Sequence, residues 1–113
     1  MASWYSAKLL FRSTVNGLIV AQPLCEESIR VLVAETDEAA QVRAAEVGRS
    51  AEHEYVNEHG ELVRWSFVAV LDLQDLCVTE LEDGMEVFSR LFRDASGGGE
   101  AGEPGDVGSG AGT

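Results

Sequence analysis

The stretch from Glu61 to Leu73 constrains the fold of this chain more than any other part of its sequence. Its apolar residues alternate with the period of a β-strand, and one face would carry Val63, Trp65, Phe67, Ala69 and Leu71. Val68 and Val70 make the opposite face apolar as well. A strand that is apolar on both faces is typical of the centre of a sheet. We therefore predict a long central strand here, with Trp65 and Phe67 in the core.

Two earlier segments, Trp4–Ser13 and Ser28–Glu35, also alternate and are predicted strands. The side chains that we expect these two strands to place in the core are Tyr5, Leu9, Phe11, Val31 and Val33. Asn16-Gly17 predicts a tight turn after the first strand, whereas Pro23 disfavours regular pairing. Thr14–Cys25 is therefore expected to be a loop or an irregular hairpin.

One helix is predicted between these strands and the central strand. Thr36 is a suitable N-cap, and the acidic Asp37 and Glu38 favour the helix dipole at its start. The predicted buried stripe is Ala40, Ala44, Val47 and Ala51. These side chains are small, so the helix should approach its sheet closely, and Gly48 is expected to end it.

The chain is predicted to form one α+β domain over residues 1–93. Glu54–Asn57 should form a hairpin with the central strand through a turn that ends at Gly60. Met85–Phe92 is predicted as a last strand, although its spacing also fits a helix. The predicted fold is then an antiparallel sheet of about five strands with one helix packed on one face, in the order ββαβββ.

Residues 94–113 are predicted to be a disordered, acidic, Gly-rich tail. Residues 96–113 hold eight of the chain's twelve glycines and no large apolar side chain except Val107. Such a segment buries too little apolar surface to offset the entropy lost on ordering.

The charge balance is strongly acidic, with 20 Asp and Glu against 8 Lys and Arg and a net charge of −12. This field repels nucleic acids and anionic membrane surfaces, and it attracts a basic protein partner. No apolar run approaches the roughly 20 residues of a membrane span, and Lys8 and Arg12 interrupt the first apolar segment. The protein is therefore expected in the cytoplasm, where Cys25 and Cys77 would be free thiols.

No catalytic residue, metal site or cofactor is predicted. His53 and His59 should lie roughly 20 Å apart along a strand that rises about 3.3 Å per residue, too far to share an ion. Neither cysteine has a His or Lys within several residues to serve as its base. The acidic residues between Asp72 and Glu86 lack the spacing of a calcium loop.

The face of the sheet away from the helix is the most unusual predicted feature. By the alternation above, its apolar side chains would be Trp4, Leu10, Leu32, Val68 and Val70. Water is expected on that side of a sheet covered by a single helix, so something should cover these residues or bind them. The loop Thr14–Cys25, with Leu18 and Ile19, is one candidate cover, and a second copy of the chain is another.

Four segments together resemble the bacterial family of domain of unknown function 4288. They are Trp4-Tyr5-Ser6-Ala7-Lys8-Leu9, Asp37-Glu38-Ala39, Gly60-Glu61-Leu62-Val63-Arg64-Trp65-Ser66-Phe67 with Val70, and Asp83-Gly84-Met85-Glu86-Val87-Phe88-Ser89. The resemblance extends from residue 4 to about 92. It implies a small bacterial cytosolic protein with no assigned activity, and it favours the strand for Met85–Phe92.

The sequence thus favours a noncatalytic protein-interaction module that binds a basic protein, as small immunity or antitoxin proteins do. One alternative is a structural homo-oligomer or accessory subunit that uses the apolar sheet face as its contact. Another is a small enzyme or cationic-metabolite binder that uses the acidic residues 72–86.

Overall fold

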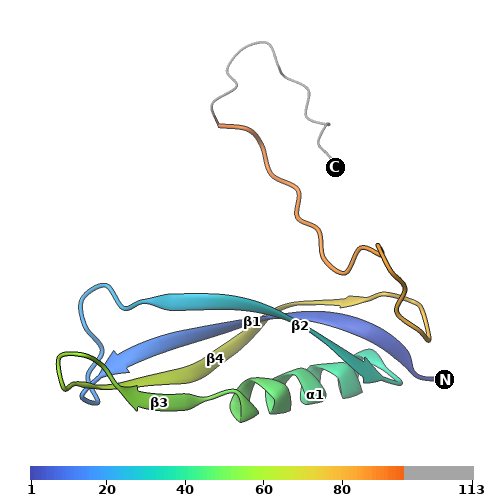
Figure 1. The fold of residues 1–113 in the computed structure, drawn as a ribbon. Helices are drawn as coiled ribbons and strands as arrows, with labels where there is room; N and C mark the ends of the chain where they lie inside the picture. The colour runs from blue at the N-terminus through green and yellow to red at the C-terminus, as the bar shows by residue number, and fades with distance from the viewer. Residues whose placement is uncertain (96–113) are drawn as a thin grey trace.

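The computed structural model describes residues 1–95, in which an antiparallel sheet carries one helix against one face (Figure 1). The elements are β1 (Ser3–Val15), β2 (Cys25–Ala34), α1 (Asp37–Ser50), β3 (His53–Val56) and β4 (Leu62–Asp75). The sheet order is β2-β1-β4-β3, so the long strands β1 and β4 form the centre. The α+β class is confirmed, but the described residues form four strands rather than five.

The prediction of a last strand at Met85–Phe92 is wrong, because these residues form neither strand nor helix. The chain leaves the sheet just after β4, where Cys77 has a positive φ of 59° and its N–H donates to the Asp75 carboxylate at 2.8 Å. It then crosses the face away from α1, where the Lys8 ammonium lies 5.2 Å from the centre of the Phe88 ring. A segment that crosses a face has no strand edge to pair with.

The predicted tail, residues 94–113, lies outside the described residues apart from its first two.

The helix begins where the sequence predicts and ends later. The Thr36 hydroxyl accepts a hydrogen bond from the Ala39 N–H at 3.0 Å, which confirms the N-cap. Gly48 does not end the helix, which continues to Ser50. Instead Gly48 is buried against the sheet, and a Cβ at this position would meet three ring carbons of Phe67 within 3 Å. The glycine is therefore required for close packing and not for a left-handed turn.

The core lies between α1 and one face of the central strands. It contains Tyr5, Ala7, Leu9, Phe11, Leu32, Ala34, Ala40 and Ala44, with Val47, Ala51, Trp65, Phe67, Val70 and Leu73 packed partly buried against it. The prediction that Val31 and Val33 lie in the core is wrong, because both side chains are exposed. Tyr5 pairs with Leu32, and residues directly opposite in an antiparallel pair share a face, so Leu32 points inward and the two valines outward.

Two irregularities in β4 explain why Val70 lies on the helix side. The register of β4 against β1 shifts at Val68 and again at Leu71, where one extra residue is inserted each time. Each such bulge breaks the simple alternation of faces. Val70, which alternation places on the outer face, consequently packs against the core.

Two tight turns at one end of the sheet are tied together. Asn16 and Gly17 both have positive φ, 52° and 81°, as a two-residue hairpin turn requires. The Asn16 side chain accepts a hydrogen bond from the Leu62 N–H at 2.9 Å, and its own N–H donates to the Leu62 carbonyl at 2.7 Å. The turn predicted before Gly60 is also present, and Gly60 has a φ of 78°.

A hydrogen bond connects the start of the helix to the central strand. The buried Tyr5 hydroxyl donates to the Asp37 carboxylate at 2.8 Å. This bond, together with burial and the negative charge of Asp37, raises the pKa of Tyr5 to about 12.

We expect Gly48→Ala to destabilise the protein. Ala in place of Gly in an exposed helix adds about 1 kcal/mol of stability. Here the methyl group would overlap the Phe67 ring, so the free energy of unfolding should fall by about 1 to 3 kcal/mol. Urea unfolding measures the change, and Val42→Ala, at an exposed position of α1, is the control and should be neutral or slightly stabilising. A Gly48→Ala protein more stable than wild type would contradict the close packing.

The Tyr5 hydrogen bond should make stability fall at alkaline pH. The folded-state pKa of Tyr5 lies above its ordinary value of 10.0. The contribution of the Tyr5 hydrogen bond to the free energy of unfolding is therefore complete below pH 10 and is lost as the pH rises toward 12. Tyr5→Phe removes the hydroxyl and with it this pH-dependent contribution. The difference in unfolding free energy between the wild type and the variant should therefore shrink between pH 10 and 12. A constant difference across that range would contradict the assignment.

Candidate functional site

The face of the sheet away from α1 differs from the one that the sequence predicts. Of the seven residues expected at an interface, Trp4 and Leu10 lie half-buried on this face and Val68 is exposed at its bulge. Leu32, which is 4% exposed, and Val70 belong to the core side instead.

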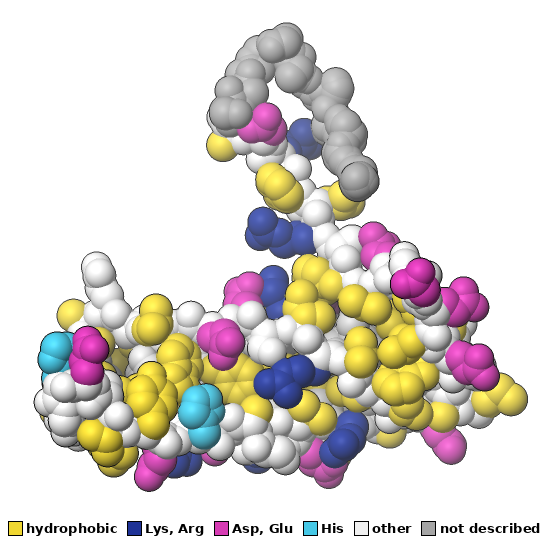
Figure 2. Space-filling model, in the orientation of Figure 1, with side chains coloured by type: hydrophobic (Ala, Val, Ile, Leu, Met, Phe, Trp, Pro, Cys, Tyr) yellow, Lys and Arg dark blue, Asp and Glu magenta, His cyan; other side chains and the backbone are white. Residues whose placement is uncertain are grey.

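The C-terminal segment covers part of this face. Trp4 donates its N–H to the Val78 carbonyl at 2.8 Å and accepts from the Leu76 N–H at 2.9 Å, so the segment begins beside β1. It then crosses the outer face, where the centre of the Phe88 ring lies 5.2 Å from the Lys8 ammonium. Ser6 is only 1% exposed although it points away from the core, and its hydroxyl has no hydrogen-bond partner among residues 1–95. Figure 2 shows hydrophobic side chains gathered where this segment meets the sheet. The segment that follows β4 therefore supplies the cover over β1.

The loop between β1 and β2 does not act as the cover. Leu18, Ile19, Val20 and Leu24 are all exposed, between 46% and 69%. The loop extends at the end of the sheet where the two tight turns meet (Figure 1). Leu18 and Ile19 are accordingly available for contacts, but they lie apart from Trp4 at the opposite end of β1.

The edge strand β2 carries exposed aliphatic residues that the sequence analysis missed as candidates for an interaction site. Ile29, Val31 and Val33 are 43%, 40% and 44% exposed, on the face away from the helix. They line an edge, since β2 has β1 on one side and no strand on the other within the described residues. These residues are identified by the register of β2 with β1. The sequence of β2 alone does not identify them, because both of its faces are apolar from Val31 to Ala34.

The backbone of the same three residues is also unpaired on its outer side. Successive residues of a strand direct their backbone N–H and carbonyl groups to opposite neighbouring strands. Trp4 directs both groups toward residues 76 and 78, on the β4 side, so the next residue, Tyr5, directs both of its groups toward β2. Tyr5 therefore exchanges hydrogen bonds with its partner Leu32, and the alternation turns the groups of Val31 and Val33 outward. This outer row of donors and acceptors can pair with an added strand. We call Glu27–Val33 the β2 edge.

Acidic residues flank the aliphatic part of this edge. Glu27 precedes Ile29 and forms an ion pair with Lys8 at 3.1 Å. Glu35 follows the strand directly and is exposed. The edge therefore presents three aliphatic side chains between two carboxylates.

The opposite edge, β3, is less suited to receive a strand. It is only four residues long, and Glu54 on it forms an ion pair with Arg64 at 3.2 Å. Short edge strands with charged side chains are the usual protection against strand addition. The two edges of the sheet are thus unequal.

Titratable side chains elsewhere are dispersed. No group of three or more His, Cys, Asp or Glu residues that could hold a metal ion occurs among residues 1–95. Cys25 and Cys77 are free and exposed. At the end of β4, hydrogen bonds from the Cys77 backbone N–H and the Ser3 hydroxyl lower the pKa of Asp75, so this carboxylate is used in the turn that follows the strand. The helix α1 is too short and too polar to cross a membrane, and it is the one helix in the described part of the chain.

Comparison with known protein families gives a match over most of the described residues. A family model described as "Domain of unknown function (DUF4288)" matches residues 4–89, which span β1 to the C-terminal segment. No curated protein and no solved structure matches the chain significantly.

Proposed function

The chain belongs to the DUF4288 family, whose description names no activity, and we propose from the structure that it is a noncatalytic protein-interaction module. It binds an extended segment of a basic partner protein, which adds as a further strand along the β2 edge.

One observation supports this proposal above the others. On the β2 edge, exposed aliphatic side chains and outward backbone groups belong to the same residues, Ile29, Val31 and Val33. An added strand would satisfy the backbone groups and remove the side chains from water in a single contact. Main-chain hydrogen bonds supply affinity in this mode of binding, and alternate side chains supply specificity.

Charge indicates what kind of segment fits. The protein has a net charge of −12, and Glu27 and Glu35 flank the aliphatic residues of the edge. A complementary strand therefore has apolar residues at alternate positions with Lys or Arg at each end. A second copy of this chain lacks that complementarity, because it would bring two acidic surfaces together.

Binding of a capped, fluorescein-labelled peptide, KTVTVTVTK, to the full-length protein tests the proposal by fluorescence anisotropy. We expect saturable binding that weakens as salt is added, because the flanking charges are exposed and screened. Val31→Pro should weaken binding at least about tenfold, since proline removes an outward N–H that makes no bond to β1.

Val31→Thr is the matched variant, because it keeps the outward N–H and the branched side chain, and it should bind more tightly than Val31→Pro. Circular dichroism and melting temperature establish that both variants are folded. Equal binding by wild type and Val31→Pro would contradict strand addition. Sedimentation of the free protein as a dimer that Val31→Pro dissociates would show that a second copy, and not a basic partner, occupies the edge.

A further inference from the structure

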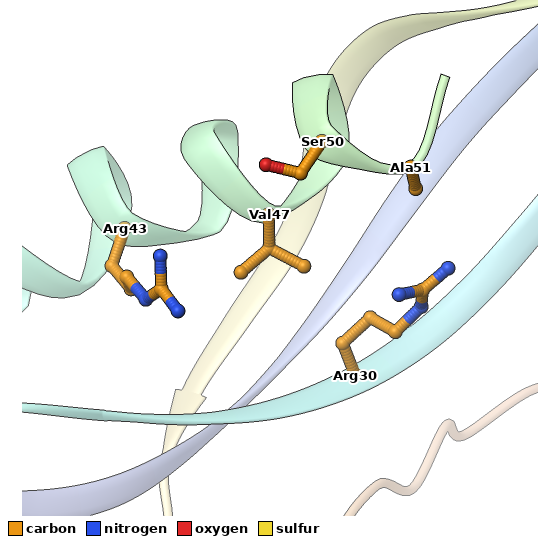
Figure 3. A pocket seen from close by; sticks show the side chains of 5 residues that line it. All are labelled: Arg30, Arg43, Val47, Ser50 and Ala51. Carbon is orange, nitrogen blue, oxygen red and sulfur yellow. The ribbon is translucent and has the colours of Figure 1, made fainter. Parts of the chain in front are cut away.

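A groove lies beside the β2 edge, between β2 and α1 (Figure 3). It has a volume of about 280 Å³ and is lined by Arg30, Arg43, Val47, Ser50 and Ala51. Arg30 comes from the strand and Arg43 from the helix, and Figure 3 shows both side chains beside the aliphatic Val47. Two guanidinium groups thus line one small groove in a protein whose net charge is −12.

These two positive charges are incompletely neutralised. The Arg30 side chain donates through Nε to the Ser28 hydroxyl at 2.9 Å, and no carboxylate lies within ion-pair distance of it among residues 1–95. Arg43 meets the exposed Glu46 at 3.4 Å, which leaves donors of its guanidinium group unused. Two like charges that line one groove favour an anion between them.

The position of Arg30 connects the groove to strand addition. Arg30 pairs with the buried Ala7, so its side chain leaves β2 on the helix side. A strand bound along the β2 edge would place its own side chain opposite Arg30 on that same side. That side chain would therefore extend into the groove.

We propose that the groove selects a glutamate in the bound strand, at the position directly opposite Arg30. This inference rests on the proposed strand addition and names the acidic side chain that the added strand must carry. The glutamate carboxylate accepts hydrogen bonds from the Arg30 and Arg43 guanidinium groups, and its methylene groups pack on Val47 and Ala51. The preferred strand is thus basic at its ends, apolar on the face away from the helix, and acidic at one position on the helix side.

Two capped peptides test the selection, KTVTVEVTK and KTVTVQVTK. In the antiparallel alignment their lysines lie opposite Glu27 and Glu35, and the sixth residue lies opposite Arg30. We expect the glutamate peptide to bind the full-length protein about tenfold more tightly than the glutamine peptide. Bulk electrostatics predicts the reverse order, because the glutamine peptide is the more positive and the protein is acidic.

Variants of the groove assign the effect to the two arginines. Arg30→Gln and Arg43→Gln should each reduce the ratio between the affinities for the glutamate and glutamine peptides, whatever each variant does to the binding of the glutamine peptide alone. Arg49→Gln is the matched control, because Arg49 lies in the last turn of α1 and does not line the groove, and it should keep the full preference.

The possible outcomes separate the two proposals. Equal binding of both peptides, with the binding still lost in Val31→Pro, would overturn the selection by the groove and leave strand addition intact. Failure of both peptides to bind would overturn strand addition, and the selection with it. A preference for glutamate that persists in both Arg30→Gln and Arg43→Gln would place the recognition elsewhere and overturn the role of the groove.

Discussion

Backbone pairing on both sides of β1 is the constraint on which the rest of this structure depends. β1 pairs with β2 along one side and with β4 along the other, and it contributes four of the buried core side chains, Tyr5, Ala7, Leu9 and Phe11. Because its hydrogen bonds fix the register of both neighbours, β1 also determines which of their side chains face the helix. The close contact of Gly48 with Phe67 is possible only because that register turns Phe67 toward α1.

The sequence allowed most elements to be predicted, but not every face. The Thr36 cap, the turns at Asn16 and Gly60 and the long central strand follow from local patterns that tertiary contacts do not override. The inward positions of β2 cannot be read from β2 itself, because its residues are apolar on both faces, and only pairing with Tyr5 settles them. Val70 was misplaced because a bulge leaves no signature in hydrophobic periodicity. The groove was not foreseeable either, since Arg30 and Arg43 are brought together only when α1 packs beside β2.

The apolar surface on the outer face of the sheet has two parts, one that the fold covers and one that it leaves exposed. The segment after β4 crosses the outer face at Lys8, and Ser6 on that face is buried, so the surface over β1 contributes to the fold. The aliphatic residues of β2 stay exposed beyond this cover, and they adjoin a strand edge with unused hydrogen-bonding groups. Net charge of one sign opposes self-association along such an edge, and the partner that we propose for it has the opposite charge.

The paired bulges of β4 bear on how the length of this chain can vary. A residue inserted or deleted within a regular strand moves every following side chain to the other face of the sheet. Val68 and Leu71 are already extra residues relative to β1, so the loss of either one restores regular pairing at that point and all the neighbouring residues keep their faces. Among relatives of this protein, changes of one residue in the length of β4 are therefore expected at these two positions and not at Trp65 or Phe67, whose placement the core requires.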